Sequence, residues 1–177
     1  MTTTRFRRIV AATLGTMLAI SAAGAAGAET VAKNWAPPPY RIQAQALSDD
    51  IMAHHPELWS VTFHGVPPGL DKVYTMFAGS YPDRIGNPDD PDDIDVIVKG
   101  ISSLDPRWHR HDARGKLVLQ IPLRDKSGES VGLLVLAYKI GPDMHMTERD
   151  YFAAGTLLRD QLEEKIPSYA ALFAKAQ

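Results

Sequence analysis

The sequence predicts an α+β fold in which a single antiparallel sheet is flanked by helices near the two ends of the chain. Helical periodicity occurs in blocks near both ends, and strand-like runs occupy most of the region between them. Short Pro/Gly-rich or polar turns join the strand-like runs, and strands and helices do not alternate regularly. This order argues against a parallel Rossmann-like sheet and favours antiparallel pairing.

The first half of the predicted domain contains one helix and one strand pair. Residues 40–54 are predicted to be helical, because apolar residues recur there at helical intervals and Pro56 discourages continuation. Residues 59–66 and 72–79 alternate in the manner of strands and are separated by a Pro/Gly turn. We therefore expect these two runs to pair antiparallel.

An aspartate-rich segment, IGNPDDPDDID, occupies residues 85–95. Asp90 followed by Pro91 is typical of a helix N-cap and first helical position, and carboxylates at Asp92 and Asp93 suit the positive end of the helix dipole. The alternative is a calcium loop, but the EF-hand pattern requires a glycine at its sixth position and a distal glutamate. Since both are missing, helix capping is the favoured interpretation.

The second half contains the clearest hairpin of the chain. In KLVLQIPL, residues 116–123, leucine and isoleucine recur at every second position, and the returning strand VGLLVLAYKI is apolar on both faces. A short strand is also predicted around Trp108. Thr147 and Asp150 then resemble a capping box, which predicts a helix to about Lys165 and a short final helix after Pro167.

Three segments are predicted along the chain: a signal peptide at residues 1–28, a Pro-rich leader at 29–39 and one domain at 40–177. The N-terminus carries arginines, a short apolar run and small residues ending at Ala28, which is typical of secretory signals. A retained anchor is the alternative, but the apolar run is short of the roughly 20 residues that span a membrane. We expect a periplasmic or secreted protein that is not integral to the membrane after cleavage.

Composition excludes several classes of protein. The formal net charge is −2 and the chain has no basic stripe, so nucleic acid is not an expected partner. The chain has no cysteine, which excludes disulfides and a lipid-anchored lipoprotein. No motif of a nucleophilic hydrolase is present, although His64 acting as a base in an uncharacterised hydrolase is retained as an alternative.

Two segments together resemble a known family. RIGNPDDPDDIDVIVKG and VLQIPLRDKSGESVGLLVLAYK are similar to the exported PAS-like sensory modules called single Cache domains, over roughly residues 40–165. The resemblance implies a sheet of about five antiparallel strands, a long N-terminal helix and a small-molecule pocket between the sheet and overlying loops. Because no second membrane span or output domain is apparent, we expect a free-standing, non-catalytic binding or sensing module with a protein signalling partner.

The expected ligand site combines side chains from the first strand pair and the following loop. His64 ends an apolar strand where its ring can face a cavity, and Arg84 can clamp a small carboxylate with two hydrogen bonds. The predicted ligand-binding residues are His64, Tyr74, Met76, Tyr81 and Arg84. The alternative is structural: a histidine satisfied by the backbone, a core tyrosine and an arginine paired with a nearby aspartate.

Metal handling is a physically different hypothesis. His109 and His111 are two residues apart and would share a face on a strand, and His145 and Met146 add soft ligands that suit copper or zinc. Haem binding through the same residue types is a further alternative. Because none of these residues has the spacing of an established metal motif, we expect neither a metal nor a cofactor, and these four residues are weak candidates only.

Overall fold

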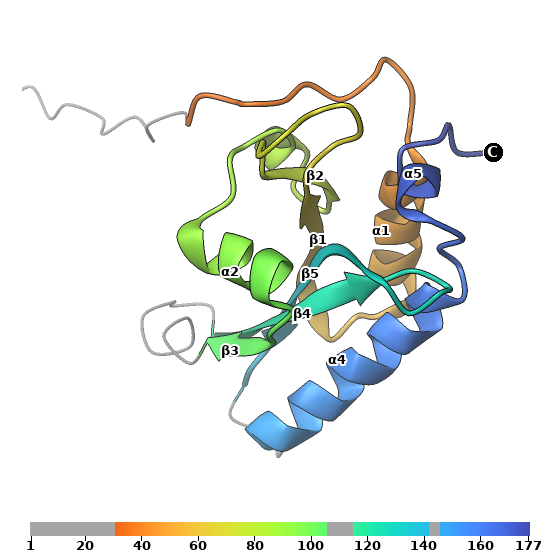
Figure 1. Cartoon of the computed structure of the whole chain (residues 1–177). Helices are drawn as coiled ribbons and strands as arrows, with labels where there is room; N and C mark the ends of the chain where they lie inside the picture. Colours follow the sequence, from red (N-terminus) through yellow and green to blue (C-terminus); the bar gives the residue numbers. More distant parts are fainter. Residues whose placement is uncertain (1–30, 106–114, 142–145) are drawn as a thin grey trace, which may run out of the picture. The chain divides into compact units, whose positions relative to one another are not determined.

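One antiparallel sheet organises the described part of the chain (Figure 1). The computed structural model describes residues 31–105, 115–141 and 146–177, and residues 31–177 form one compact unit. The elements are α1 (Gln43–His54), β1 (Leu58–Gly65), β2 (Thr75–Gly79), the 3-10 helix η1 (Pro82–Arg84), α2 (Pro91–Lys99), β3 (Ser103–Asp105), β4 (Lys116–Arg124), β5 (Ser130–Lys139), α4 (Glu148–Glu163) and α5 (Tyr169–Leu172). Within these ranges no helix combines the length and apolar character needed to cross a bilayer.

The five strands lie in the order β2-β1-β5-β4-β3, and every neighbouring pair is antiparallel. The first strand pair and the last hairpin are therefore joined at the centre of the sheet, where β1 pairs with β5. This arrangement confirms the predicted α+β, PAS-like fold: a single antiparallel sheet of five strands with flanking N- and C-terminal helices.

The two faces of the sheet differ in chemistry because successive side chains of a strand point to opposite sides. On one face, buried apolar residues such as Phe63, Leu119 and Leu136 pack against α1, α4 and α5 and form the core. On the opposite face, β1 presents Ser60, Thr62 and His64, while α2 lies across β4 and β5 (Figure 1). The polar face is the one that carries the candidate site.

Helix α2 begins as the aspartate pattern predicts. Asp90 is the N-cap, Pro91 is the first helical residue, and the backbone N–H of Asp90 donates to Asp93 Oδ2 at 3.4 Å as part of a capping box. Gly100 ends the helix in the left-handed conformation, with φ of 64°. The capping prediction is confirmed, and it fixes where the carboxylates of this segment lie.

Two elements begin three residues later than predicted. The second strand begins at Thr75 rather than at residue 72, because Lys72 adopts a positive φ of 56° and the 66–74 connection does not pair with β1. The helix predicted over residues 40–54 begins at Gln43. The strand expected around Trp108 lies outside the described residues.

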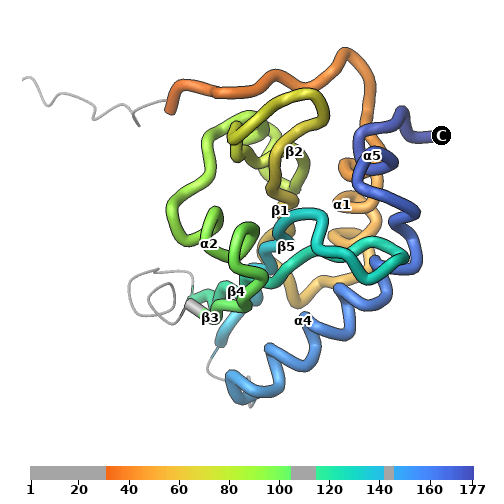
Figure 2. Tube along the Cα trace, in the orientation of Figure 1, coloured from red at the N-terminus to blue at the C-terminus, as the bar shows by residue number. Residues whose placement is uncertain are grey.

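The Pro-rich leader runs past the end of the sheet that carries β2 (Figure 2), and its backbone contacts the domain at Asn34 and Trp35. The backbone N–H of Asn34 donates to the carbonyl of Gly86 at 2.9 Å, and the Trp35 ring meets Phe173 edge-on at 6.2 Å. Gly86 has a φ of +87°, and a Cβ built there would lie 2.1 Å from the carbonyl oxygen of Trp35. The contact between leader and loop therefore requires a glycine at residue 86.

Substituting this glycine tests the leader contact. Alanine at either position carries the same left-handed strain of roughly 1–2 kcal/mol. Because the Cβ of Gly86→Ala also clashes with the leader, we expect this variant to lower the free energy of unfolding by at least about 1 kcal/mol more than Gly69→Ala. Gly69 is a matched control because its φ is +83° and nothing lies within 4 Å of its added Cβ. Urea unfolding measures both values, and equal losses would contradict the leader contact.

Candidate functional site

A pocket of about 350 Å³ opens on the polar face of the sheet. Its floor comes from β1, β4 and β5 together with Asp93, and its wall from Met76 of β2 and the rest of the segment 81–93, which runs from Tyr81 into the first turn of α2. Its lining residues are Ser60, Thr62, His64, Met76, Tyr81, Arg84, Asp90, Asp92, Asp93, Lys116, Val118, Gln120, Val135 and Ala137. A volume of this size is at the lower end of the range for small-molecule sites.

His64 is the centre of a hydrogen-bonded group in this pocket. Its Nδ1 lies 2.7 Å from Asp89 Oδ1 and 3.9 Å from Asp93 Oδ2, and its Nε2 lies 2.7 Å from the Thr62 hydroxyl. From β4, Gln120 Nε2 donates to Asp93 Oδ1 at 2.7 Å. The group therefore joins two strands of the sheet to the segment that covers it.

Two oxygen atoms of this group have no donor. The Asp89 side chain is fully buried, and its Oδ2 has no hydrogen-bond partner among the described residues. Gln120 is 6% exposed, and within the same part of the chain its Oε1 also has no partner. Buried polar atoms are paired in the great majority of proteins, so two unpaired acceptors beside one histidine need a physical explanation.

Both buried carboxylates are electrostatically unfavourable. Burial raises the pKa of Asp89, although its hydrogen bond to His64 and the charge of that ring act in the opposite direction. Burial likewise raises the pKa of Asp93, against the charge of His64 and the hydrogen bond from Gln120. The neighbouring aspartates add repulsion in both cases, so the pocket floor favours a positive partner.

Four of the five predicted ligand-binding residues line this one pocket: His64, Met76, Tyr81 and Arg84. The guanidinium of Arg84 is exposed and lies 5.7 Å from the centroid of the Tyr81 ring. Tyr74 lines a different pocket, beside Gly65 and Tyr169. Tyr74 precedes β2, which begins at Thr75, so the side chains of Tyr74 and Met76 do not share a strand face as expected.

Sequence reasoning did not include Asp89, Asp93, Thr62 and Gln120 in the site. Asp93 was assigned to helix capping, which is correct but incomplete, because its other oxygen meets Gln120 from β4. Thr62 could have been found, since it precedes His64 by two residues on one strand and must share its face. Nothing local in the sequence indicates that Asp89 reaches His64, since the contact is long-range.

The residues named for metal handling are mostly beyond reach of the structure. His109, His111 and His145 lie outside the described residues. Met146 is described, and its side chain is largely exposed at the start of the segment before α4. These weak metal candidates therefore stay predictions.

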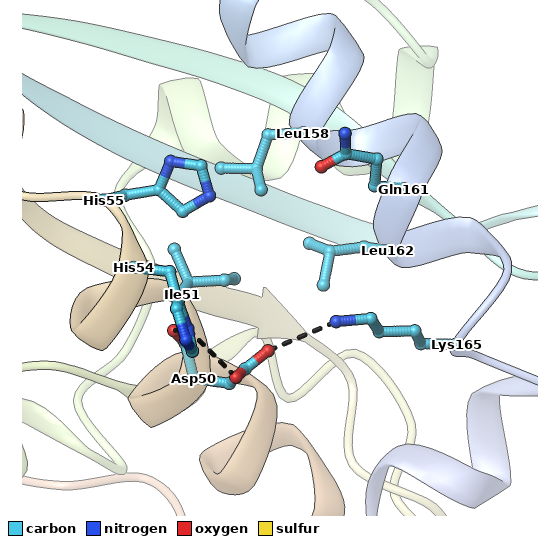
Figure 3. Close-up of a pocket in the computed structure, with 8 residues that line it drawn as sticks. All are labelled: Asp50, Ile51, His54, His55, Leu158, Gln161, Leu162 and Lys165. Atoms are coloured by element: carbon cyan, nitrogen blue, oxygen red, sulfur yellow. Dashed lines mark hydrogen bonds and ion pairs between the residues drawn. The ribbon is translucent and has the colours of Figure 1, made fainter.

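A second pocket, of about 300 Å³, lies between α1 and α4 (Figure 3). Lys165 Nζ pairs with Asp50 Oδ2 at 3.2 Å across it, and the hydrogen bond from Lys165 lowers the pKa of Asp50. His54 Nδ1 lies 2.8 Å from the Asp50 carbonyl and 3.2 Å from Asp50 Oδ1, whereas His55 Nδ1 lies 2.8 Å from Glu57 Oε1. The two histidines have separate partners, so this exposed ion pair fastens helices together and does not assemble a shared metal site.

Comparison with known proteins assigns no function to the chain. No family model and no curated protein matches the sequence. One similar solved structure is that of the repressor BlcR of Agobacterium tumefaciens, with 14% sequence identity and a TM-score of 0.40. The match covers 72% of this chain and 68% of that chain. The function is therefore argued from the pocket.

The buried carboxylates predict an unusual dependence of stability on pH. A raised native pKa means that the folded state binds more protons than the unfolded state between the unfolded pKa of about 3.9 and the native pKa. We expect Asp89 to lower the stability of the protein as pH rises over this interval, the loss to be complete above the native pKa, and the loss to disappear in Asp89→Asn. Urea unfolding from pH 4 to 8 with EDTA present measures the difference between the two proteins.

Asp150→Asn is the control of opposite sign. Hydrogen bonds from Thr147 lower the pKa of Asp150, so the stability that it provides is present above the unfolded pKa and is lost as pH falls. A difference between the unmodified protein and Asp89→Asn that follows the Asp150 pattern would contradict the account of the buried carboxylate.

Proposed function

We propose that the chain is an exported, non-catalytic small-molecule-binding and sensing module of the single Cache type, acting in the periplasm or outside the cell. The observation that supports the proposal most strongly is the 350 Å³ pocket on the polar face of a PAS-like sheet. A concave pocket that combines apolar side chains with a few convergent polar groups is typical of a small-molecule site.

The ligand class follows from the distribution of charge in the pocket. Asp93 and the Asp89 behind it make the floor acidic, while Arg84 and Lys116 bring positive charge to the same lining. A small carboxylate that also carries an amino group would meet opposite charges at both of its ends. Arg84 would grip the carboxylate, and the floor would attract the amine.

The sensing step would use the segment 81–93 as the moving wall. Ser80 is anchored to β1 through its backbone N–H, which donates to the Val61 carbonyl at 2.9 Å, and Asp89 is anchored through His64. Between these anchors, Pro82, Asp83 and Arg84 are exposed. A ligand that contacts Arg84 would order this stretch and alter the surface offered to a protein partner.

A hydrolase is the second candidate, because of one specific observation. Thr62 Oγ1, His64 and Asp89 form a chain with two contacts of 2.7 Å, which is the connectivity of a nucleophile, a base and an orienting acid. Thr62, however, pairs with Gly79 on one side and Val135 on the other, so the surrounding backbone serves the sheet ladder. We therefore favour binding over catalysis.

Thermal melting in EDTA tests the binding function with a panel of small carboxylates, amines and amino acids. We expect at least one amino-carboxylate to raise the melting temperature. At a ligand concentration of 100 times the dissociation constant, binding stabilises the folded protein by about 2.7 kcal/mol. Arg84→Ala should weaken this shift, while Arg149→Ala on the exposed side of α4 should leave it unchanged.

Ala137→Phe is the complementary variant, since it fills the pocket floor without altering charge. A ligand whose shift survives both Ala137→Phe and Arg84→Ala would bind elsewhere, and the proposed function would then be wrong.

Activity against activated esters separates the second candidate from the first. We expect no ester hydrolysis above that of the matched variant Thr62→Val, which keeps the side-chain shape and removes the hydroxyl. Turnover that is lost in both Thr62→Val and His64→Gln would favour the hydrolase and contradict a non-catalytic module.

A further inference from the structure

We infer that His64, Asp89 and Asp93 form a binding site for a divalent transition-metal ion at the floor of the pocket. The three residues come from the end of β1, the loop before α2 and the first turn of α2. Each offers one ligand atom, and these three atoms all lie within 4.8 Å of one another. This site does not include the four metal candidates that the sequence suggested, which are His109, His111, His145 and Met146.

The geometry needs only small side-chain adjustments to accept an ion. Ligands about 2.1 Å from one ion lie roughly 3 to 4 Å apart. His64 Nδ1 is 2.7 Å from Asp89 Oδ1, slightly closer than this range, and 3.9 Å from Asp93 Oδ2, within it, and no two of the three ligand atoms are more than 4.8 Å apart. Small rotations of the two carboxylates would place His64 Nδ1 and one oxygen of each aspartate around a common centre.

The unpaired oxygen atoms are the independent observation that points to a cation. Asp89 Oδ2 and Gln120 Oε1 are buried acceptors for which the described residues supply no donor. Asp89 is completely shielded from solvent, and Gln120 lines the pocket beside Asp93. An ion satisfies oxygen lone pairs directly, whereas helix capping explains neither the burial of Asp89 nor the orientation of Gln120.

The surroundings of His64 and Asp93 resemble the supporting contacts that hold metal ligands in place. If Nδ1 binds the ion, Nε2 carries the ring proton and donates to Thr62 Oγ1, at the observed 2.7 Å. That hydrogen bond would fix the tautomer and the orientation of the ring. Gln120 Nε2 holds Asp93 in the same manner at 2.7 Å.

Charge selects the class of ion. Two buried carboxylates and a neutral imidazole carry two negative charges, and a divalent ion neutralises them. One nitrogen and two carboxylate oxygens suit Zn²⁺, Mn²⁺ or Fe²⁺, whereas Ca²⁺ and Mg²⁺ prefer oxygen ligands alone. Three protein ligands leave positions open toward the pocket, where the amino group of the proposed organic ligand could complete the coordination while its carboxylate meets Arg84.

The metal site adds to the proposed binding function and can be tested without it. Calorimetric titration of the purified, EDTA-stripped protein with Zn²⁺ and with Mn²⁺ should show one ion bound per chain, and little heat with Mg²⁺. We expect His64→Gln, Asp89→Asn and Asp93→Asn each to weaken binding by about 10–100-fold or more. Asp95→Asn is the matched control, because Asp95 lies in the same helix, pairs with Lys99 at 2.7 Å and does not line the pocket.

Circular dichroism confirms that each variant is folded, and if His64→Gln is not, the two aspartate variants decide. Absence of binding by Zn²⁺ and Mn²⁺ would overturn the inference, as would binding that survives all three ligand variants. Loss of binding in His109→Ala/His111→Ala alone would assign the metal to another site. An organic ligand that still binds in EDTA would leave the proposed function intact in each of these cases.

Discussion

The buried contact between His64 and Asp89 holds the candidate site together. It ties the end of β1 to the segment 81–93, which is also held over the sheet by the hydrogen bond from Gln120 to Asp93 and by backbone contacts. Both side chains are almost entirely shielded from solvent, so their interaction is not screened as a surface ion pair is. The position of α2, and with it Asp93, follows from this tether and from the helix start at Asp90.

The polar face of the sheet lowers the stability of the fold, and this loss of stability indicates where a functional site lies. The apolar face alone builds the core with α1, α4 and α5. The opposite face buries two carboxylates and holds two oxygen atoms for which the described part of the chain supplies no donor, which lowers the stability of the folded state. Departures of this kind from a fully satisfied interior are concentrated at functional sites, where a ligand or ion supplies the missing partner.

The fold was largely predictable because its signals are local. The alternation in 116–123 and the Asp90–Pro91 helix start are each encoded within a few residues, and both appear in the structure. His64 was predicted to face a cavity from its place in a strand, and it does. The partners Asp89 and Gln120 were not, since they reach the site over 25 and more residues of chain, through pairings that no local pattern indicates. Tyr74 lines a different pocket because β2 begins only at Thr75, a boundary that the alternation of residue types did not indicate.

A crystal structure grown with Zn²⁺ or Mn²⁺ and the amino-carboxylate that gives the largest thermal shift tests the account most directly. The account predicts an anomalous-scattering peak within bonding distance of His64 Nδ1, with organic density extending from it toward Arg84. A pocket filled by side chains, or a metal bound only at histidines elsewhere in the chain, would contradict it.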